Sequence, residues 1–158
     1  MGRRGCRRLC QPSSRGLGLS RIFWDTNLFI YLFEGLGDEA ERVVALRRRM
    51  IERRDQLLTS TLTLGELLVK PLDAGRTDLA RRYTQAMETA AAILSFDRAA
   101  ALAFAEIRRD RSIRPPDAIQ LACAAAAGTD LFLTNDRRLA RKHIRGIQFI
   151  QSLHEAVL

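Results

Sequence analysis

The sequence predicts an α/β fold, a three-layer α/β/α sandwich with a mostly parallel central sheet. Short apolar runs typical of strands alternate along the chain with amphipathic or apolar segments long enough to form helices. Such alternation favours right-handed crossovers, which make neighbouring strands parallel and cover both faces of the sheet with helices. A chain of 158 residues is also long enough for one compact domain with a sizeable apolar core.

The first half of the chain is predicted to begin the sheet. Thr26 can cap a helix that directly follows a strand, and Gly35 and Gly37 are suited to end it. A longer amphipathic helix comes next. Its run of three arginines at 47–49 is either a solvated helix face or a phosphate-binding patch. The elements expected here are a strand over residues 21–24, helices over 26–34 and 38–54, and a strand over 57–61.

The second half is predicted to complete the alternation. Pro71 is expected to end one helix, and Asp97 is a good N-cap for another. The segment 117–127 is apolar nearly all round, so its helix should be buried against the sheet. The elements expected here are helices over residues 63–70, 77–91, 98–109, 117–127 and 136–142, and strands over 92–96, 131–134 and 147–150.

Charge and composition divide the chain into a basic extension and a nearly balanced body. Residues 1–19 are expected to be a disordered N-terminal extension, 20–152 a single domain and 153–158 a C-terminal tail. The net charge of the chain is +8. Five of these charges come from the arginines in residues 1–20, a segment that holds no acid. The body, with a net charge of +3, is therefore only a weak indication of an anionic partner. The Arg- and Ser-rich extension also fits an organellar transit peptide or a start codon placed too far upstream.

Several functional classes are disfavoured by what the sequence lacks. No apolar run approaches the ~20 residues of a membrane-spanning helix, and no secretory signal is apparent. Neither a Walker loop nor the pattern G-x-G-x-x-G occurs, which argues against nucleotide switches and dehydrogenases. The three cysteines, Cys6, Cys10 and Cys123, form neither a zinc pattern nor a disulfide framework. A reducing cytoplasm is the expected location.

Four acidic residues are expected to meet at one edge of the sheet. Asp25 and Asp136 come one or two residues after predicted strands, and Asp117 opens the buried helix. Glu66 lies in a segment that is apolar on most sides. In open α/β sheets, ligands bind beyond the carboxyl ends of the strands, so the four carboxylates are candidates for one site.

Each acid also has an explanation that involves no site. Asp25 and Asp136 suit the caps of their own helices, and Asp117 with Gln120 resembles a capping box. Glu66 could simply face solvent. Taken together these explanations are weaker than they are singly, because Glu66 has no capping role and the other three acids recur on one side of the predicted fold.

Clustered carboxylates favour a hard divalent cation, since without one they repel each other and some must take up protons. Oxygen ligands suit Mg²⁺ or Mn²⁺, whereas His143 and His154 alone give little support for zinc. Such a site activates water and stabilises the charge that develops when a phosphodiester is displaced. A glycosidase would need only two carboxylates.

Four segments together resemble the PIN domain family, specifically the VapC-type toxin ribonucleases. They are Phe23-Trp24-Asp25-Thr26-Asn27, Ser60-Thr61-Leu62-Thr63-Leu64-Gly65-Glu66, Arg114-Pro115-Pro116-Asp117-Ala118-Ile119-Gln120-Leu121-Ala122 and Leu131-Phe132-Leu133-Thr134-Asn135-Asp136. The resemblance implies a PIN-like nuclease domain over residues 20–152. It also implies that Asp25, Glu66, Asp117 and Asp136 are the catalytic acids.

The resemblance further assigns a role to each residue. It implies that Asp25, Asp117 and Asp136 bind Mg²⁺ or Mn²⁺, with Asp25 in direct contact and the other two bound directly or through water. Glu66 would position water or a second cation. Asn27 and Thr134 would orient the carboxylates and the substrate.

The family also suggests the reaction and the partners. Members cleave RNA endonucleolytically, and many are toxins of type II toxin–antitoxin systems, inhibited by a cognate antitoxin and commonly homodimeric. The apolar run at residues 28–33 is too long for one helix face to bury, which favours a protein interface. Three alternatives stay open, namely a solitary PIN nuclease, a catalytically lapsed PIN-like RNA-binding or scaffold protein, and a structure-specific DNA or RNA nuclease.

Overall fold

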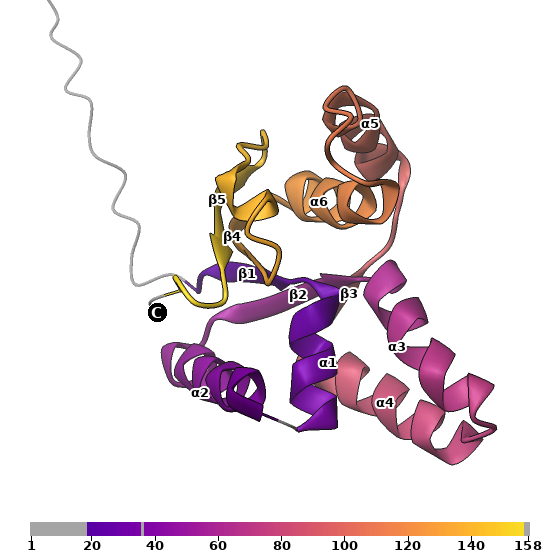
Figure 1. The fold of residues 1–158 in the computed structure, drawn as a ribbon. Coiled ribbons are helices and arrows are strands. Elements are labelled where there is room, and N and C mark those ends of the chain that lie inside the picture. The colour runs from indigo at the N-terminus through magenta and orange to yellow at the C-terminus, as the bar shows by residue number, and fades with distance from the viewer. Residues whose placement is uncertain (1–18, 36, 157–158) are drawn as a thin grey trace, which may run out of the picture.

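Five parallel strands form the centre of the molecule. The computed structural model describes residues 19–35 and 37–156. Its sheet has the order β3-β2-β1-β4-β5, and every neighbouring pair is parallel (Figure 1). The predicted α/β fold is confirmed, with a sheet that is wholly parallel. The strands are β1 (Arg21–Trp24), β2 (Gln56–Ser60), β3 (Ala92–Leu94), β4 (Thr129–Thr134) and β5 (Ile147–Ser152).

Six α-helices among the described residues cover the two faces of the sheet. Helices α1 to α4 lie on one face, and α5 and α6 lie on the other (Figure 1). A short 3₁₀ helix, η1 (Leu139–Arg141), connects β4 to β5. The α-helices are α1 (Thr26–Glu34), α2 (Gly37–Arg53), α3 (Thr61–Asp73), α4 (Thr77–Ala90), α5 (Arg98–Ile107) and α6 (Pro115–Ala127).

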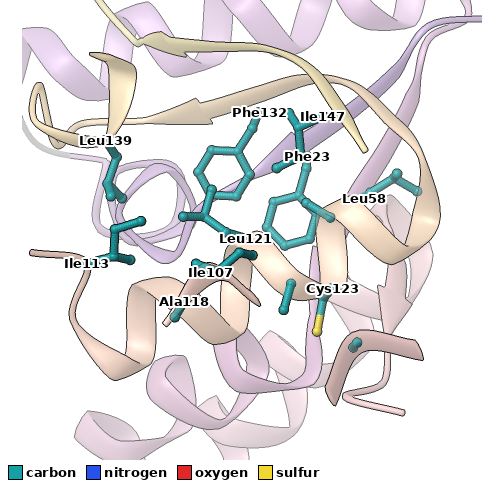
Figure 2. Packing of buried hydrophobic residues seen from close by; sticks show 13 residues of the cluster. Phe23, Leu58, Ile107, Ile113, Ala118, Leu121, Cys123, Phe132, Leu139 and Ile147 are labelled. Carbon is teal, nitrogen blue, oxygen red and sulfur yellow. The ribbon is translucent and has the colours of Figure 1, made fainter. Parts of the chain in front are cut away.

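Alternate side chains of the strands enter two apolar cores, one on each face. Phe23 of β1 stacks on Phe132 of β4 with ring centroids 5.1 Å apart, in the core that α5 and α6 cover (Figure 2). Ile22 and Trp24, on either side of Phe23 in the chain, are fully buried in the opposite core. Helix α6 is buried against the sheet, as its composition predicts, because its alanines allow close approach.

The apolar run in α1 is largely used by the second core. Leu28 and Phe29 are fully buried, and the remaining four side chains, residues 30–33, are partly buried against the same cluster. Phe33 stacks on Tyr83 of α4 at 4.6 Å. Packing within the chain thus explains much of the run, and its role in a protein interface stays a prediction.

Helix α3 differs from the sequence prediction because it continues through Pro71 to Asp73. A proline inside a helix removes one backbone hydrogen bond, and here it lies only two residues before the last residue of the helix. The Pro71 ring is buried, so the apolar surface that it contributes offsets the lost bond. Beyond it, Arg76 N–H donates to the Pro71 carbonyl at 2.7 Å and closes the turn.

The segment after β4 is less helical than predicted. Of the expected helix over residues 136–142, only the 3₁₀ helix η1 forms. Asp136 satisfies the backbone N–H of Arg138 at 2.8 Å and thereby stabilises a tight turn in place of a first α-helical turn. Strands β2 to β5 also differ from the prediction by one or two residues at one or both ends, where edge pairing and not composition sets the limit.

The predicted N-terminal extension lies outside the described residues apart from Leu19. The proposed domain limits at residues 20 and 152 therefore stay predictions, as does the disorder of the extension. Within residues 19–35 and 37–156, no helix has both the length and the apolar character required to cross a bilayer.

Candidate active site

The sheet order places a binding crevice between β1 and β4. From β1 the chain winds outward through β2 to β3, and it returns to the other side of β1 to form β4 and β5. The direction of winding thus reverses at the β1–β4 pair, and ligands of doubly wound sheets bind beyond the carboxyl ends of the strands at such a reversal. Asp25 directly follows β1, and Asp136 follows β4 by two residues.

The structure brings all four candidate acids to this place. One cavity of about 460 Å³ is lined by Asp25, Glu66, Asp117 and Asp136, together with Asn27 and Arg114. The acids come from four different elements or their ends, namely the start of α1, the middle of α3, the first turn of α6 and the segment after β4. Residues separated by as many as 111 positions in the chain therefore face one space.

Asp25 is the most deeply buried of the four acids, with a relative exposure of 8%. One of its oxygens accepts the backbone N–H of Thr26 at 2.7 Å, and the other accepts the hydroxyl of Thr134 at 2.8 Å. Burial raises the pKa of Asp25 to about 6, against the effect of these two hydrogen bonds, and the negative charges of Asp117 and Glu66 raise it further. The carboxylate is thus held in one orientation in a setting that disfavours its charge.

Thr134 connects two of the acids. Its hydroxyl donates to Asp25 and accepts the backbone N–H of Asp136 at 3.0 Å. Thr134 is fully buried at the end of β4, so its position is fixed by the sheet. This geometry suits the orienting role that the family resemblance implies for Thr134. Asn27, the other predicted orienting residue, is exposed and lines the cavity.

Glu66 is exposed on α3, yet it is not free to rotate. It accepts a hydrogen bond from the hydroxyl of Thr26, which is itself buried. Glu66 is therefore attached through Thr26 to the residue that follows Asp25. A Glu66 that simply faced solvent would be exposed, as it is, but it would not accept the hydrogen bond from Thr26.

A buried polar network beneath the cavity was not predicted from the sequence. Gln120 of α6 is 3% exposed, and its amide N–H groups donate to the hydroxyls of Thr26 and Thr63 at 2.9 and 2.8 Å. Its amide oxygen accepts the hydroxyl of Ser60 at 2.6 Å. The network joins α1, α3 and α6 directly below Glu66. A glutamine on an otherwise apolar helix was the only signal available in the sequence.

The capping explanations hold for only some of the acids. Asp25 does cap α1, and Asp136 does bind the backbone of Arg138. Asp117 does not cap α6, because the N-cap residue is Arg114 and the helix begins with two prolines. The capping box of Asp117 with Gln120 is wrong, since the Gln120 side chain belongs to the buried network.

Two arginines that sequence analysis missed are bound to the acids. Arg114 pairs with Asp117 through Nε at 2.8 Å and Nη2 at 3.3 Å. Arg138 pairs with Asp136 through Nη2 at 2.8 Å and Nε at 3.2 Å, and this hydrogen bonding lowers the pKa of Asp136. Arg114 Nη2 also lies 3.9 Å from Asp136.

The chemistry of these side chains fits a hard divalent cation. The acids present only oxygen donors, and the Asp25 carboxylate is already fixed by two hydrogen bonds. In the conformation described for residues 19–35 and 37–156, no three Asp, Glu, His or Cys side chains converge closely enough to hold one ion. Arginines pair with Asp117 and Asp136 instead, so a cation at these two carboxylates would compete with the arginines for them.

The chain belongs to the PIN domain family, whose sequence profile matches residues 22–144. The match includes all four acids and the whole β1–β4 crevice. Divalent metals are typical of PIN domains. No curated protein matches the sequence significantly.

Three solved structures with the same fold are VapBC or other toxin–antitoxin proteins. The DNA-bound VapBC of Salmonella typhimurium is 21% identical, covers 85% of this chain and 99% of its own, and superposes with a TM-score of 0.67. VapBC2 of Rickettsia felis, bound to a DNA fragment from its promoter, is 14% identical, covers 83% and 97%, and has a TM-score of 0.63. A toxin–antitoxin complex from Klebsiella pneumoniae is 23% identical, covers 81% and 95%, and has a TM-score of 0.58. At these identities the likeness establishes the fold.

Proposed function

We propose that this PIN domain protein is a metal-dependent endoribonuclease that hydrolyses RNA phosphodiester bonds and acts as the toxin of a type II toxin–antitoxin pair. The observation that supports the nuclease is the meeting of Asp25, Glu66, Asp117 and Asp136 in one cavity at the β1–β4 crevice. This is an oxygen-rich site without a nucleophilic serine or cysteine or a histidine base among its lining residues. Metal-assisted hydrolysis is the chemistry that such a site suits.

Asp25, Asp117 and Asp136 are the residues that would hold Mg²⁺ or Mn²⁺. When bound, the cation lowers the pKa of water and stabilises negative charge on the phosphate. The protein fixes Asp25 from two sides through Thr134 and the Thr26 backbone, so this ligand is preorganised. The raised pKa of Asp25 supports this role, because a nearby positive charge would offset the burial and the neighbouring negative charges that disfavour its ionised form.

Glu66 is the candidate for orienting the attacking water. It enters the cavity from α3, on a different element from the three proposed metal ligands, and Thr26 holds its carboxylate. Thr26 is in turn held by Gln120. Asn27 lies at the cavity wall, where its amide can contact the substrate.

The proposed partners rest on the structural neighbours and on α1. All three superposed structures are toxin–antitoxin proteins, which supports a cognate antitoxin for this chain. The partly buried side chains at residues 30–33 of α1 support a protein interface, either with the antitoxin or in a homodimer. Relief of toxicity on co-expression with the product of a neighbouring small gene tests the antitoxin, and persistence of toxicity would refute the pairing.

The nuclease is tested by RNA cleavage with Mn²⁺ and with chelator. Wild type should cleave only with the metal, and Asp25→Asn and Glu66→Gln should each lose about 100-fold or more in rate, as for removal of one charge-stabilising group. Matched controls are Asp97→Asn, which keeps a helix cap outside the cavity, and Glu88→Gln on the exposed face of α4. Equal cleavage by all five proteins would mean a contaminant or a different site.

The same assay separates the alternatives. Single-stranded RNA, duplex RNA and DNA flaps are digested side by side, and preference for flaps would favour a structure-specific nuclease. Absence of cleavage of every substrate, with RNA still bound, would favour a lapsed PIN-like RNA-binding protein.

A further inference from the structure

Arg114 and Arg138 each pair with one of the acids, Arg114 with Asp117 and Arg138 with Asp136. Arg114 is the N-cap residue of α6, and Arg138 follows β4 at the start of η1. Both arginine side chains are exposed, at 62% and 71%, whereas the side chains that they contact, Asp117 and Asp136, are only 15% and 18% exposed. Each pair therefore joins an exposed arginine to a partly buried carboxylate that lines the cavity.

Each arginine engages its carboxylate through two nitrogens. The Asp117 oxygens accept Nε and Nη2 of Arg114, and the Asp136 oxygens accept Nε and Nη2 of Arg138. A paired guanidinium takes one lone-pair direction of each oxygen, and its positive charge repels a cation that approaches the remaining ones. Pairing with arginine and ligation of a divalent ion are thus mutually opposed at both acids.

A second cavity, of about 550 Å³, lies beside the first and shares Asp117 and Asp136 with it. Its lining is strongly basic, with Arg137, Arg138, Arg141 and Lys142. Arg138, once released from Asp136, therefore remains in a basic space where a polyanion can lie. Arg114 lines the adjoining cavity, which shares Asp117 and Asp136 with this space. Phosphate groups accept two parallel hydrogen bonds from a guanidinium just as carboxylates do.

We propose that Arg114 and Arg138 exchange between two partners, pairing with Asp117 and Asp136 when no divalent cation is bound, and with phosphates of the substrate strand when the cation takes those oxygens. The inference rests on the proposed metal site and adds two substrate-positioning residues to it. It accounts for exposed arginines that are held on sheltered acids at the mouth of the site. It also predicts two effects of opposite sign when the arginines are removed, namely tighter binding of Mn²⁺ and weaker binding of RNA.

The first effect is on metal affinity, measured without RNA. Binding of Mn²⁺ is followed by the electron paramagnetic resonance signal of the free ion, so no catalysis is needed. Arg114→Gln and Arg138→Gln should each bind Mn²⁺ about threefold more tightly than wild type, in line with the loss of one exposed ion pair. The double variant should bind it about tenfold more tightly if the two effects add.

Arg137→Gln is the matched control. Arg137 lies between Asp136 and Arg138 and lines the same basic cavity, but among the described residues it makes no hydrogen bond or ion pair with either acid. Its removal tests whether the loss of any nearby positive charge is sufficient to tighten Mn²⁺ binding. It should change the Mn²⁺ affinity by less than about twofold, because a cation at Asp117 and Asp136 displaces no hydrogen bond or ion pair of Arg137.

The second effect is on RNA affinity with Mn²⁺ present. It is measured by fluorescence anisotropy of a short single-stranded RNA in a Glu66→Gln background, which blocks cleavage. Adding Arg114→Gln and Arg138→Gln should weaken RNA binding and lower the slope of log affinity against log salt by about 0.7 per arginine. Arg81→Gln, on the exposed face of α4, should leave the RNA affinity unchanged.

The outcomes separate this inference from the proposed function. If wild type binds no Mn²⁺, the metal site and the exchange both fail. If wild type binds Mn²⁺ but the two arginine variants bind it equally or more weakly, or if Arg137→Gln tightens binding as much as they do, the exchange alone is refuted. Unchanged RNA affinity in the double variant would also refute it. Thermal unfolding of each variant shows whether the fold is intact.

Discussion

At the scale of single residues, the site depends on a carboxylate that the fold stabilises poorly. Burial raises the pKa of Asp25 to about 6, well above its ordinary value of 3.8. The native state therefore binds more protons than the unfolded state between these two pH values, and the contribution of Asp25 to stability decreases as the pH rises through that interval. Above pH 6 the buried charge is a full cost to the metal-free protein.

Asp25→Asn should consequently stabilise the metal-free protein. At pH 8 we expect its free energy of unfolding to exceed that of wild type by about 1 to 2 kcal/mol, since a shift of one pKa unit corresponds to about 1.4 kcal/mol and some hydrogen bonding is lost. The gain should disappear toward pH 4. Urea unfolding of both proteins with chelator, at pH 8 and at pH 4, measures this difference. The prediction is contradicted if Asp25→Asn is less stable than wild type by a larger amount at pH 8 than at pH 4.

Gln120 should matter for stability as well as for the site. Replacing it with Leu leaves the hydroxyls of Ser60, Thr26 and Thr63 without their shared partner in a buried position. We expect Gln120→Leu to lower the free energy of unfolding by about 2 to 3 kcal/mol, the cost of unsatisfied buried polar groups. Gln148→Leu, at an exposed position of β5, is the control. Equal urea midpoints for the two variants would show that the network does not contribute.

The residue types near the site were predictable to different degrees. Asp25 and Asp136 could be grouped from sequence because each follows a strand, and the carboxyl ends of parallel strands share one edge. Gln120 could not be placed, since a local capping pattern competed with a tertiary network over the same side chain. Arg114 and Arg138 could not be singled out from 24 arginines without the geometry of their partners.

At the scale of elements, two exposed glycines differ in whether their position requires a glycine. Gly146, in the turn before β5, has a φ of +94°, and a Cβ there would meet the Ala125 carbonyl oxygen at 2.6 Å. Gly65 lies inside α3 with open space around it. The turn therefore requires glycine, whereas the helix does not.

Alanine at these two positions should shift stability in opposite directions. Gly146→Ala should lower the free energy of unfolding by about 2 kcal/mol or more, because strain and a backbone clash combine. Gly65→Ala should raise it by about 0.5 to 1 kcal/mol through helix propensity. Thermal or urea unfolding of the pair measures both effects, and a destabilised Gly65→Ala would indicate a contact of α3 that the structure does not contain.

Most elements followed from periodicity, and the exceptions have local causes. The helix over residues 26–34 and the strand over 21–24 were predicted with their observed limits, since cap residues and glycines mark both ends. Helix α3 was predicted too short because Pro71 normally ends a helix, whereas here its ring is buried near the end of one. The 136–142 segment was predicted too helical because the turn made by Asp136 is invisible to periodicity.

At the scale of the whole molecule, the order of the strands in the sheet brings acids that are far apart in the sequence to one cavity. Reversal of the strand order at the β1–β4 pair leaves a crevice to which α1, α3, α6 and the end of β4 each contribute one carboxylate. The resemblance to the PIN domain family, predicted from four short motifs, is confirmed by the match over residues 22–144. Ion pairing within the crevice depends on side-chain conformation, so no sequence motif predicts it.

The most direct test of the shared site is diffraction from crystals grown with Mn²⁺, recorded where manganese scatters anomalously. The account predicts an anomalous peak within ligand distance, about 2.0 to 2.3 Å, of carboxylate oxygens of Asp25 and of Asp117 or Asp136, with Arg114 and Arg138 turned away. A well-ordered crevice without such a peak, while manganese binds elsewhere on the protein, would contradict it.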